Sequence, residues 1–190
     1  MQRILLAVSG ASGMPLAHIL ARTLRDAGVE LHLIVSPSAA EVLRVECGTD
    51  AAQLQNFAHH IYDPSDMGAP PASGSWRHSG MIVCPCSMAT LGAIANGVGT
   101  HLIHRAADVC FKERLPLVLV PRETPLSRVH LRNMLAAQEA GAVIMPLCPG
   151  FYTGADSVTA LLEHLAGRVL DQIGIAHSLG RRWGEDNAHA

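Results

Sequence analysis

The fold is decided by the segment from residue 81 to residue 123, which reads MIVCPCSMATLGAIANGVGTHLIHRAADVCFKERLPLVLVPRE. It contains two uniformly apolar runs, each interrupted by proline, with helix-forming stretches between them. Uniformly apolar strands that alternate with helices are typical of a parallel sheet buried on both faces. The segment therefore predicts an α/β fold with a Rossmann-like, doubly wound parallel sheet in three αβα layers.

The rest of the chain repeats the order strand, turn, helix. We expect strands at residues 3–9, 30–36, 81–86, 115–120 and 142–145. The last helix is predicted to begin at the cap Asp156 and to run through Ile173. Residues 50–66 are expected to be irregular, with His59 and His60 facing solvent and carrying no role.

Composition indicates one domain that associates with itself. Of the 190 residues, 49% are apolar and 16% are charged, which leaves little polar surface for a monomer. We therefore expect a homo-oligomer, with a single domain at 1–175 and a tail at 176–190 that is partly ordered over the site. The net charge of -2 argues against a protein that binds nucleic acid.

Location and metal content are also predicted from composition. No apolar run approaches the roughly 20 residues that span a bilayer, and the opening lacks a cleavage site, so a cytoplasmic protein without a membrane partner is expected. The cysteine count of 5 is odd, and most of these residues have apolar neighbours, which predicts buried thiols. Cys84 and Cys86 have no further ligands at suitable spacing, so no metal site is predicted.

Hydroxyl groups follow three of the predicted strands, as Ser12, Ser36, and Ser87 with Thr90. Strand ends meet at one edge of a parallel sheet, and the free N–H groups of a helix start attract anions. A helix cap is the alternative interpretation of each serine. Together the hydroxyls favour a phosphorylated planar cofactor, either FMN or a dinucleotide.

Charged groups fall into two further patterns. Arg105, Asp108 and Lys112, the only lysine, share one helix face, and Arg122-Glu123 follows a strand between two prolines. The simpler interpretations are a solvated stripe with an internal ion pair and a local ion pair in a turn. Trp76, in a Pro/Gly/Ser-rich loop, either anchors packing or contacts another protomer.

The sequence closely resembles the flavin prenyltransferases of the UbiX/Pad type, once described as aromatic-acid decarboxylases. The matching motifs cover nearly the whole chain in order. They are GASG at 10–13, PASGS at 71–75, MIVCPCSMATLGAIANG at 81–97, RAADVCFKER at 105–114, LVLVPRETPL at 117–126, GAVIMPLCPGFY at 141–152, and RVLDQIGI followed by RRWGE.

The resemblance implies a homododecamer of Rossmann-like subunits that bind FMN where subunits meet. It also implies transfer of a dimethylallyl group from dimethylallyl phosphate to N5 of reduced FMN, followed by ring closure at C6 without a metal. The product, prenylated FMN, would serve UbiD-type decarboxylases as their cofactor.

The resemblance also implies site residues. Those placed on FMN are Gly10, Ala11, Ser12, Ser36, Ser87, Met88, Ala89, Thr90 and Arg122. Those placed on the prenyl donor are Tyr152, Arg168, Lys112, Gly74 and Ser75. Those given a part in catalysis are Ser12, Glu46, Arg105, Lys112, Glu123 and Trp183. These roles are chemically reasonable, because a leaving phosphate needs fixed cations, an allyl cation needs an aromatic wall, and a carboxylate can carry a proton.

The chain departs from the family pattern at two places. Met14-Pro15-Leu16-Ala17 follows GASG where Tyr-Gly is usual, and Pro37 stands where a lysine is common. Two alternatives remain open at this point. One is a flavin-dependent cysteine decarboxylase, which needs a catalytic histidine and a PASANT-like loop; the other is a non-catalytic flavin-binding protein.

Overall fold

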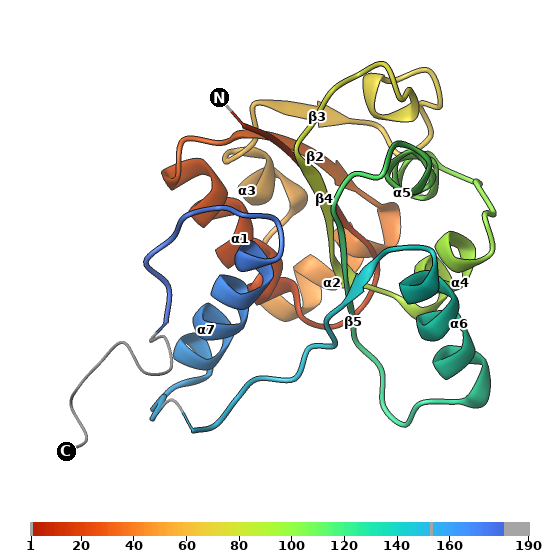
Figure 1. Cartoon of the computed structure of the whole chain (residues 1–190). Helices are drawn as coiled ribbons and strands as arrows, with labels where there is room; N and C mark the ends of the chain where they lie inside the picture. The colour runs from red at the N-terminus through yellow and green to blue at the C-terminus, as the bar shows by residue number, and fades with distance from the viewer. Residues whose placement is uncertain (1, 153, 181–190) are drawn as a thin grey trace.

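The computed structural model describes residues 2–152 and 154–180, which form a six-stranded sheet with helices on both faces (Figure 1). All strands are parallel, in the order β3-β2-β1-β4-β5-β6. This is the strand order of a doubly wound Rossmann-type sheet. The predicted α/β fold is confirmed.

The elements alternate along the chain as the sequence predicts. The strands are β1 (Arg3–Val8), β2 (Glu30–Val35), β3 (His60–Tyr62), β4 (Gly80–Cys86), β5 (Leu117–Pro121) and β6 (Val143–Ile144). The helices are α1 (Met14–Asp26), α2 (Pro37–Cys47), α3 (Ala51–Gln55), the 3-10 turn η1 (Pro70–Ala72), α4 (Met88–Ala95), α5 (Leu102–Glu113), α6 (Arg128–Glu139) and α7 (Val158–Asp171).

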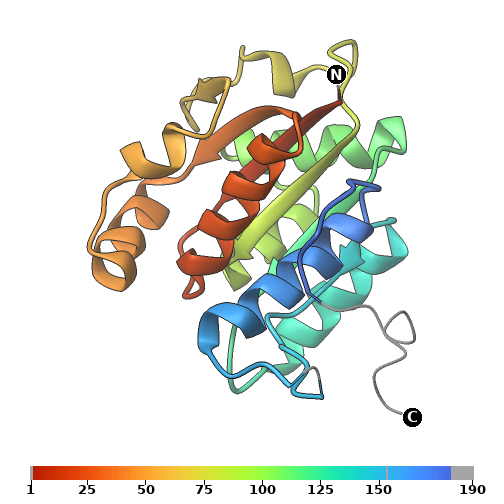
Figure 2. The ribbon, with the colours of Figure 1, turned by 90° about the vertical axis from the view of Figure 1, so that its left-hand side faces the viewer.

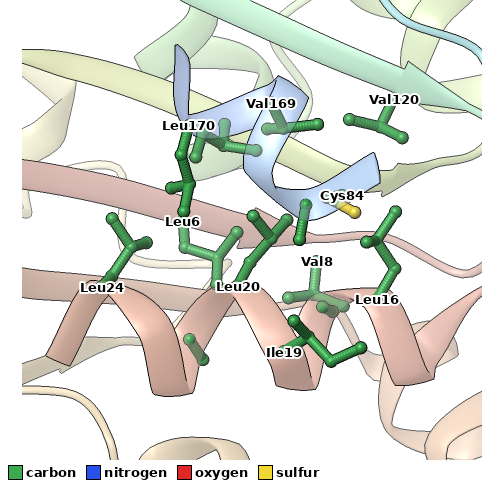
Figure 3. Packing of buried hydrophobic residues seen from close by; sticks show 14 of the residues in the cluster. Leu6, Val8, Leu16, Ile19, Leu20, Leu24, Cys84, Val120, Val169 and Leu170 are labelled. Atoms are coloured by element: carbon green, nitrogen blue, oxygen red, sulfur yellow. The ribbon is translucent and has the colours of Figure 1, made fainter. Parts of the chain in front are cut away.

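Two apolar cores sandwich the sheet, because successive side chains of a strand point to opposite faces. Leu6 and Val8 of β1 pack with α1 and α7, whereas Leu5 and Ala7 pack with α4, α5 and α6. Figure 2 shows α1 and α7 lying side by side over the first face, and Figure 3 shows Leu20 of α1 packed against Leu6. Burial on both faces explains why the central strands are apolar at every position.

Ser9 joins the two central strands where the strand order reverses. The Ser9 backbone N–H and hydroxyl both donate to Pro85 O, at 3.2 and 3.0 Å, and Ser87 N donates to Ser9 Oγ at 2.8 Å. These bonds tie the end of β1 to the end of β4. In open α/β sheets this reversal point, at the carboxyl edge, is where ligands bind.

The structure corrects two local predictions. Residues 50–66, expected to be irregular, contain α3 and the edge strand β3, which has three residues and is mostly exposed and therefore gives no apolar pattern. Helix α7 is capped by Ser157, whose Oγ accepts from Ala160 N at 3.2 Å, and not by Asp156. Asp156 stands one position too early for its carboxylate to serve as the cap.

The loop tryptophan packs inside the chain. The ring centroid of Trp76 lies 4.8 Å from that of His32, so Trp76 anchors packing.

Most of the cysteines are buried, as predicted. All of them are free; Cys84, Cys86 and Cys110 are buried, and Cys148 is exposed. Burial raises the pKa of Cys86 and of Cys110 to about 12, which keeps both as thiols. Within the described ranges, no helix has the length and apolar character needed to cross a membrane.

Candidate active site

Two helix N-termini converge at the carboxyl edge of the sheet. The Ser36 hydroxyl caps α2 by accepting from Ala39 N at 3.1 Å. The Ser87 hydroxyl caps α4 by accepting from Thr90 N at 3.2 Å, and it donates to Thr90 Oγ1 at 3.0 Å. Both serines are therefore helix caps, and each also brings the positive end of a helix dipole to this edge.

A cavity of about 330 Å³ lies between these helix starts and the start of α5. Hydroxyls, small apolar groups and two imidazoles line it, from Ser36, Ser38, Ser87, Ala89, Thr90, Ala93, Val98, Thr100, His101 and His104. Gly10 lies beside it, and a Cβ there would stand 2.5 Å from Ser38 Oγ. Glycine therefore allows the turn after β1 to approach the start of α2 closely enough to complete an anion site.

Two histidines that line this cavity were not among the predicted site residues. His101 and His104 stack with their ring centroids 3.7 Å apart, and Thr100 Oγ1 lies 3.1 Å from His104 Nδ1. Burial, aided by the neighbouring imidazole, lowers the pKa of His104 to about 4, so the ring is neutral at pH 7. The spacing of three residues at a helix start was the available signal, but it does not distinguish a cavity wall from a surface.

Glu46 and Ser12 meet at the glycine turn after β1. Glu46 Oε2 accepts from Gly13 N and from Met14 N, each at 2.9 Å, and the Ser12 side chain is a further hydrogen-bond partner. Partial desolvation raises the pKa of Glu46, but these hydrogen bonds outweigh it and leave the pKa below its ordinary value. The ionised carboxylate thus supplies the N-terminal cap that Gly13 cannot provide to α1.

Arg122 and Glu123 follow β5 at the same edge, and both are exposed. The charge of Arg122 also lowers the pKa of Glu46 and so favours the ionised carboxylate that holds the glycine turn. Glu123 Oε1 accepts from Thr124 N at 2.9 Å. The alternative interpretation, a local ion pair in a turn, is not what the structure shows. Among the described residues, Arg122 and Glu123 form no ion pair, and the Glu123 carboxylate turns back onto the following backbone.

A second group of predicted residues surrounds α5. Arg105 Nε donates to Ala72 O at 3.1 Å, and Arg105 Nη1 pairs with Asp108 Oδ2 at 2.5 Å, as the stripe interpretation predicted. Lys112 Nζ pairs with Glu113 Oε1 at 2.5 Å. A Cβ on Gly74 would stand 2.5 Å from Lys112 Nζ, so the PASGS loop lies against this lysine.

The predicted residues around α5 and those that follow β1 and β5 lie at opposite ends of the parallel strands of one subunit. Lys112 ends α5 and precedes β5, whereas Glu123 follows β5. Five strand residues at about 3.3 Å each separate the two positions by roughly 15 Å along the strand direction. Within a single chain, Lys112 therefore does not reach the carboxyl edge where Ser12, Arg122 and Glu123 lie.

The remaining predicted residues lie on or after α7. Tyr152 is exposed, with its ring 6.5 Å from that of His164 in an edge-on arrangement. Arg168, in the last turn of α7, pairs with Asp171 through a 2.8 Å contact. Trp183 lies outside the described residues, so the structure does not address its predicted role.

Comparisons with known proteins agree with this arrangement. The family model named Flavoprotein matches residues 1–170. The flavin prenyltransferase UbiX of Deinococcus radiodurans is 47% identical over 186 residues, covering 98% of this chain and 95% of the relative. The flavin prenyltransferase UbiX of Methanothermobacter thermautotrophicus is 45% identical over 180 residues, covering 95% of this chain and 94% of the relative.

Solved structures are similar over the same range. The crystal structure of AnUbiX (PadA1) in complex with FMN and dimethylallyl pyrophosphate has a TM-score of 0.94 and 44% identity, covering 96% of this chain and 97% of that one. The dodecameric FMN-dependent UbiX-like decarboxylase from Escherichia coli O157:H7 has a TM-score of 0.93 and 42% identity, covering 96% and 99%. The cysteine decarboxylase TvaF, at 21% identity and a TM-score of 0.64, shares the fold alone.

The sheet order, the hydroxyl-lined cavity at the reversal point and the family model define the protein as a flavoprotein. Identity of 45–47% to UbiX proteins over nearly the whole chain then identifies the family within the flavoproteins. The chain belongs to the UbiX family of flavin prenyltransferases, which are transferases acting on FMN.

Proposed function

We propose that the protein transfers a dimethylallyl group from dimethylallyl phosphate to N5 of reduced FMN and then closes a further ring from that group to C6, without a metal. The prenylated FMN would be the cofactor of a UbiD-type decarboxylase. Membership of the UbiX family supports the reaction class, and AnUbiX binds FMN and a dimethylallyl donor. The observation that carries the proposal is the convergence of two capped helix N-termini on one hydroxyl-lined cavity.

The residues at this edge fit FMN. The hydroxyls of Ser36, Ser87 and Thr90 would hold the phosphate at the positive ends of α2 and α4, and Arg122 adds a cation beside the glycine turn. The lack of a side chain at Gly10 leaves room for close backbone approach. When bound, reduced FMN supplies an electron-rich ring nitrogen and carbon for alkylation.

Other side chains of the chain would assist departure of the phosphate from the donor. Lys112, Arg168 and Tyr152 stabilise the phosphate that leaves with the electron pair of the allylic C–O bond. Glu123 and Ser12 hold and pass protons at their side-chain oxygens. Glu46 positions Ser12, because its carboxylate holds the turn that carries the serine.

Further predicted residues would shape this donor site. Arg105 supports the loop that approaches Lys112 by its hydrogen bond to Ala72 O. Gly74 and Ser75 of that loop allow close approach to the donor, and Trp183 would wall the allyl group.

A shared site between subunits reconciles the two separated groups. Lys112 is at the opposite sheet edge from Glu123, so a neighbouring copy must supply one of them. Exposed apolar side chains on α6 provide surface for association, namely Val129, Leu131 and Leu135. The dodecameric state of the Escherichia coli relative supports a homododecamer.

The proposal includes location and chain organisation. Free cysteines within the described ranges suit a reducing compartment, which supports a cytoplasmic protein. We assign residues 1–175 to the flavoprotein domain. The predicted tail at 176–190 lies outside the described residues from residue 181 onward.

The test is anaerobic incubation with reduced FMN and dimethylallyl phosphate, followed by mass spectrometry of the extracted flavin. We expect the flavin to gain one prenyl unit. A parallel reaction with the diphosphate identifies the preferred donor. If the flavin is bound but stays unmodified with both donors, the protein is a non-catalytic flavin-binding protein. If it decarboxylates a cysteine-containing peptide, it is a flavin-dependent cysteine decarboxylase.

A further inference from the structure

Three potential metal ligands meet at the edge of the sheet where the strands begin. Glu30 and His32 lie two residues apart on β2 and share a face, and His60 on β3 is the register partner of His32. One ligand atom from each of the three lies within 4.8 Å of the other two. We call these residues the His–Glu cluster; it lies at the opposite end of β2 from Ser36 and the flavin cavity.

The distances in the His–Glu cluster suit a small divalent cation. Glu30 Oε1 lies 3.0 Å from His32 Nε2 and 3.9 Å from His60 Nε2. Two ligands of a tetrahedral zinc ion, with bonds of about 2.1 Å, stand roughly 3.4 Å apart, between these values. The two imidazoles stack at 4.7 Å with an interplanar angle of 18°, and the Nε2 atoms of both rings lie near Glu30 Oε1.

The surroundings of His32 prepare it as a ligand. The residue is only 2% exposed, and its Nδ1 lies 2.8 Å from the Tyr62 hydroxyl. Without a metal, His32 Nε2–H donates to the Glu30 carboxylate, and Nδ1 accepts from the Tyr62 hydroxyl. Metal binding requires the other tautomer, in which Nδ1–H donates to the Tyr62 oxygen and the Nε2 lone pair faces the ion. Trp76 packs edge-on against the ring and restricts its rotation. His60, with a side chain 58% exposed, provides the entry path and the open position for water.

Arg3 is the charge that opposes a cation here. Its Nε and Nη2 each donate to Glu30 Oε1 at 3.2 Å, and Nη2 also donates to Oε2 at 3.3 Å. The carboxylate is ionised, because hydrogen bonds from His32 and Arg3 together hold the pKa of Glu30 below its ordinary value. A cation bound at Oε1 would displace the two Arg3 bonds to that oxygen and leave Arg3 paired with Oε2. The Arg3 charge therefore opposes a cation here, and its removal should increase the affinity.

We propose that Glu30, His32 and His60 bind one divalent cation of the zinc class, which clamps the edge strand β3 to β2. Two imidazole nitrogens and one carboxylate oxygen form a donor set that zinc, cobalt and nickel accept. The cluster lies at the opposite ends of the strands from the flavin cavity, and none of its three residues is among those proposed to act in prenyl transfer. Its test is therefore independent of the proposed prenyl transfer.

The experiment is a titration of the full-length, FMN-bound protein with Co²⁺, followed by competition with Zn²⁺. We expect one Co²⁺ per chain, visible d–d absorption bands typical of a tetrahedral or five-coordinate ion, and loss of those bands when Zn²⁺ is added. A protein that binds no Co²⁺, or binds it without these bands, would overturn the proposal.

Four variants assign the ligands. His60→Ala, on the exposed edge strand, and Glu30→Gln should each weaken Co²⁺ binding at least tenfold, and Arg3→Met should strengthen it. His18→Gln, a histidine of α1 outside the cluster, should leave the titration unchanged. Prenyl transfer by His60→Ala should equal that of the parent protein. Bands that persist in both His60→Ala and Glu30→Gln would exclude this site.

Discussion

Oε2 of Glu46 accepts a 2.9 Å hydrogen bond from the backbone N–H of Gly13. The acceptor belongs to the last turn of α2 and the donor to the turn that begins α1, so the bond joins the segments that follow two neighbouring strands. It orders the Gly10–Gly13 turn and leaves the Ser12 hydroxyl against a carboxylate. Glu46, to which the family resemblance gives a part in catalysis, therefore caps helix α1.

The cap predicts a stability loss for Glu46→Gln. A lost helix cap costs about 1 kcal/mol, and solvent exposure of this carboxylate keeps the cost near that value. Urea denaturation at pH 7 measures it. Glu41→Gln, on the same helix and paired with Arg44 at the surface, is the control and should change stability less.

The same cap predicts the pH dependence of this difference. The pKa of Glu46 is below the ordinary 4.5 in the folded protein, so its stabilisation is fully present above pH 4.5 and is lost as pH falls through the folded value. The gap between the parent protein and Glu46→Gln should therefore narrow below pH 4.5. A gap that stays constant across this range would contradict the ionised cap.

Gly10→Ala should reduce FMN affinity at least tenfold while the fold is retained. The new Cβ would meet Ser38 Oγ at 2.5 Å and push the glycine turn away from the start of α2, which opens the anion site. Titration of FMN by fluorescence quenching measures the affinity. Gly99→Ala, where no atom lies within 4 Å of the added Cβ, should bind FMN normally.

Lys112→Ala and Glu123→Gln should each abolish prenyl transfer and retain FMN. If one subunit supplies Lys112 and its neighbour supplies Glu123, an equal mixture of the two inactive variants, unfolded and reassembled together, contains sites with both native residues. Random mixing restores roughly a quarter of the parental rate. The parent protein, unfolded and reassembled in the same way, must regain its activity. With that control met, a reassembled mixture without activity would refute a site that two subunits share.

His104 predicts a loss of stability on acidification. Its folded pKa of about 4 lies below the ordinary 6.5, so between these values the unfolded chain binds the additional proton and stability falls as pH falls. The full effect is up to about 3 kcal/mol, since each pKa unit corresponds to about 1.36 kcal/mol. Denaturation of His104→Gln at pH 6.5 and 4.5 should show a smaller fall, and an equal fall would refute this origin.

Local patterns in the sequence determined the layered α/β fold and the two helix caps. Apolar strands buried on both faces are recognisable from a few consecutive residues, and Ser36 and Ser87 cap helices through contacts only three residues away. Long motifs shared with a known family pointed to the flavin prenyltransferases. For β3, which has three residues and is mostly exposed, the prediction was wrong because so short a segment carries too little signal.

Only the tertiary structure decided which distant residues meet. The sheet order and register bring Glu46 to Gly13, His104 to the serines of α2 and α4, and His60 to His32. The same order puts Lys112 at one edge and the residues after β5 at the other. These relationships depend on how whole strands pair and helices pack, so the spacing of residues along the chain does not contain them.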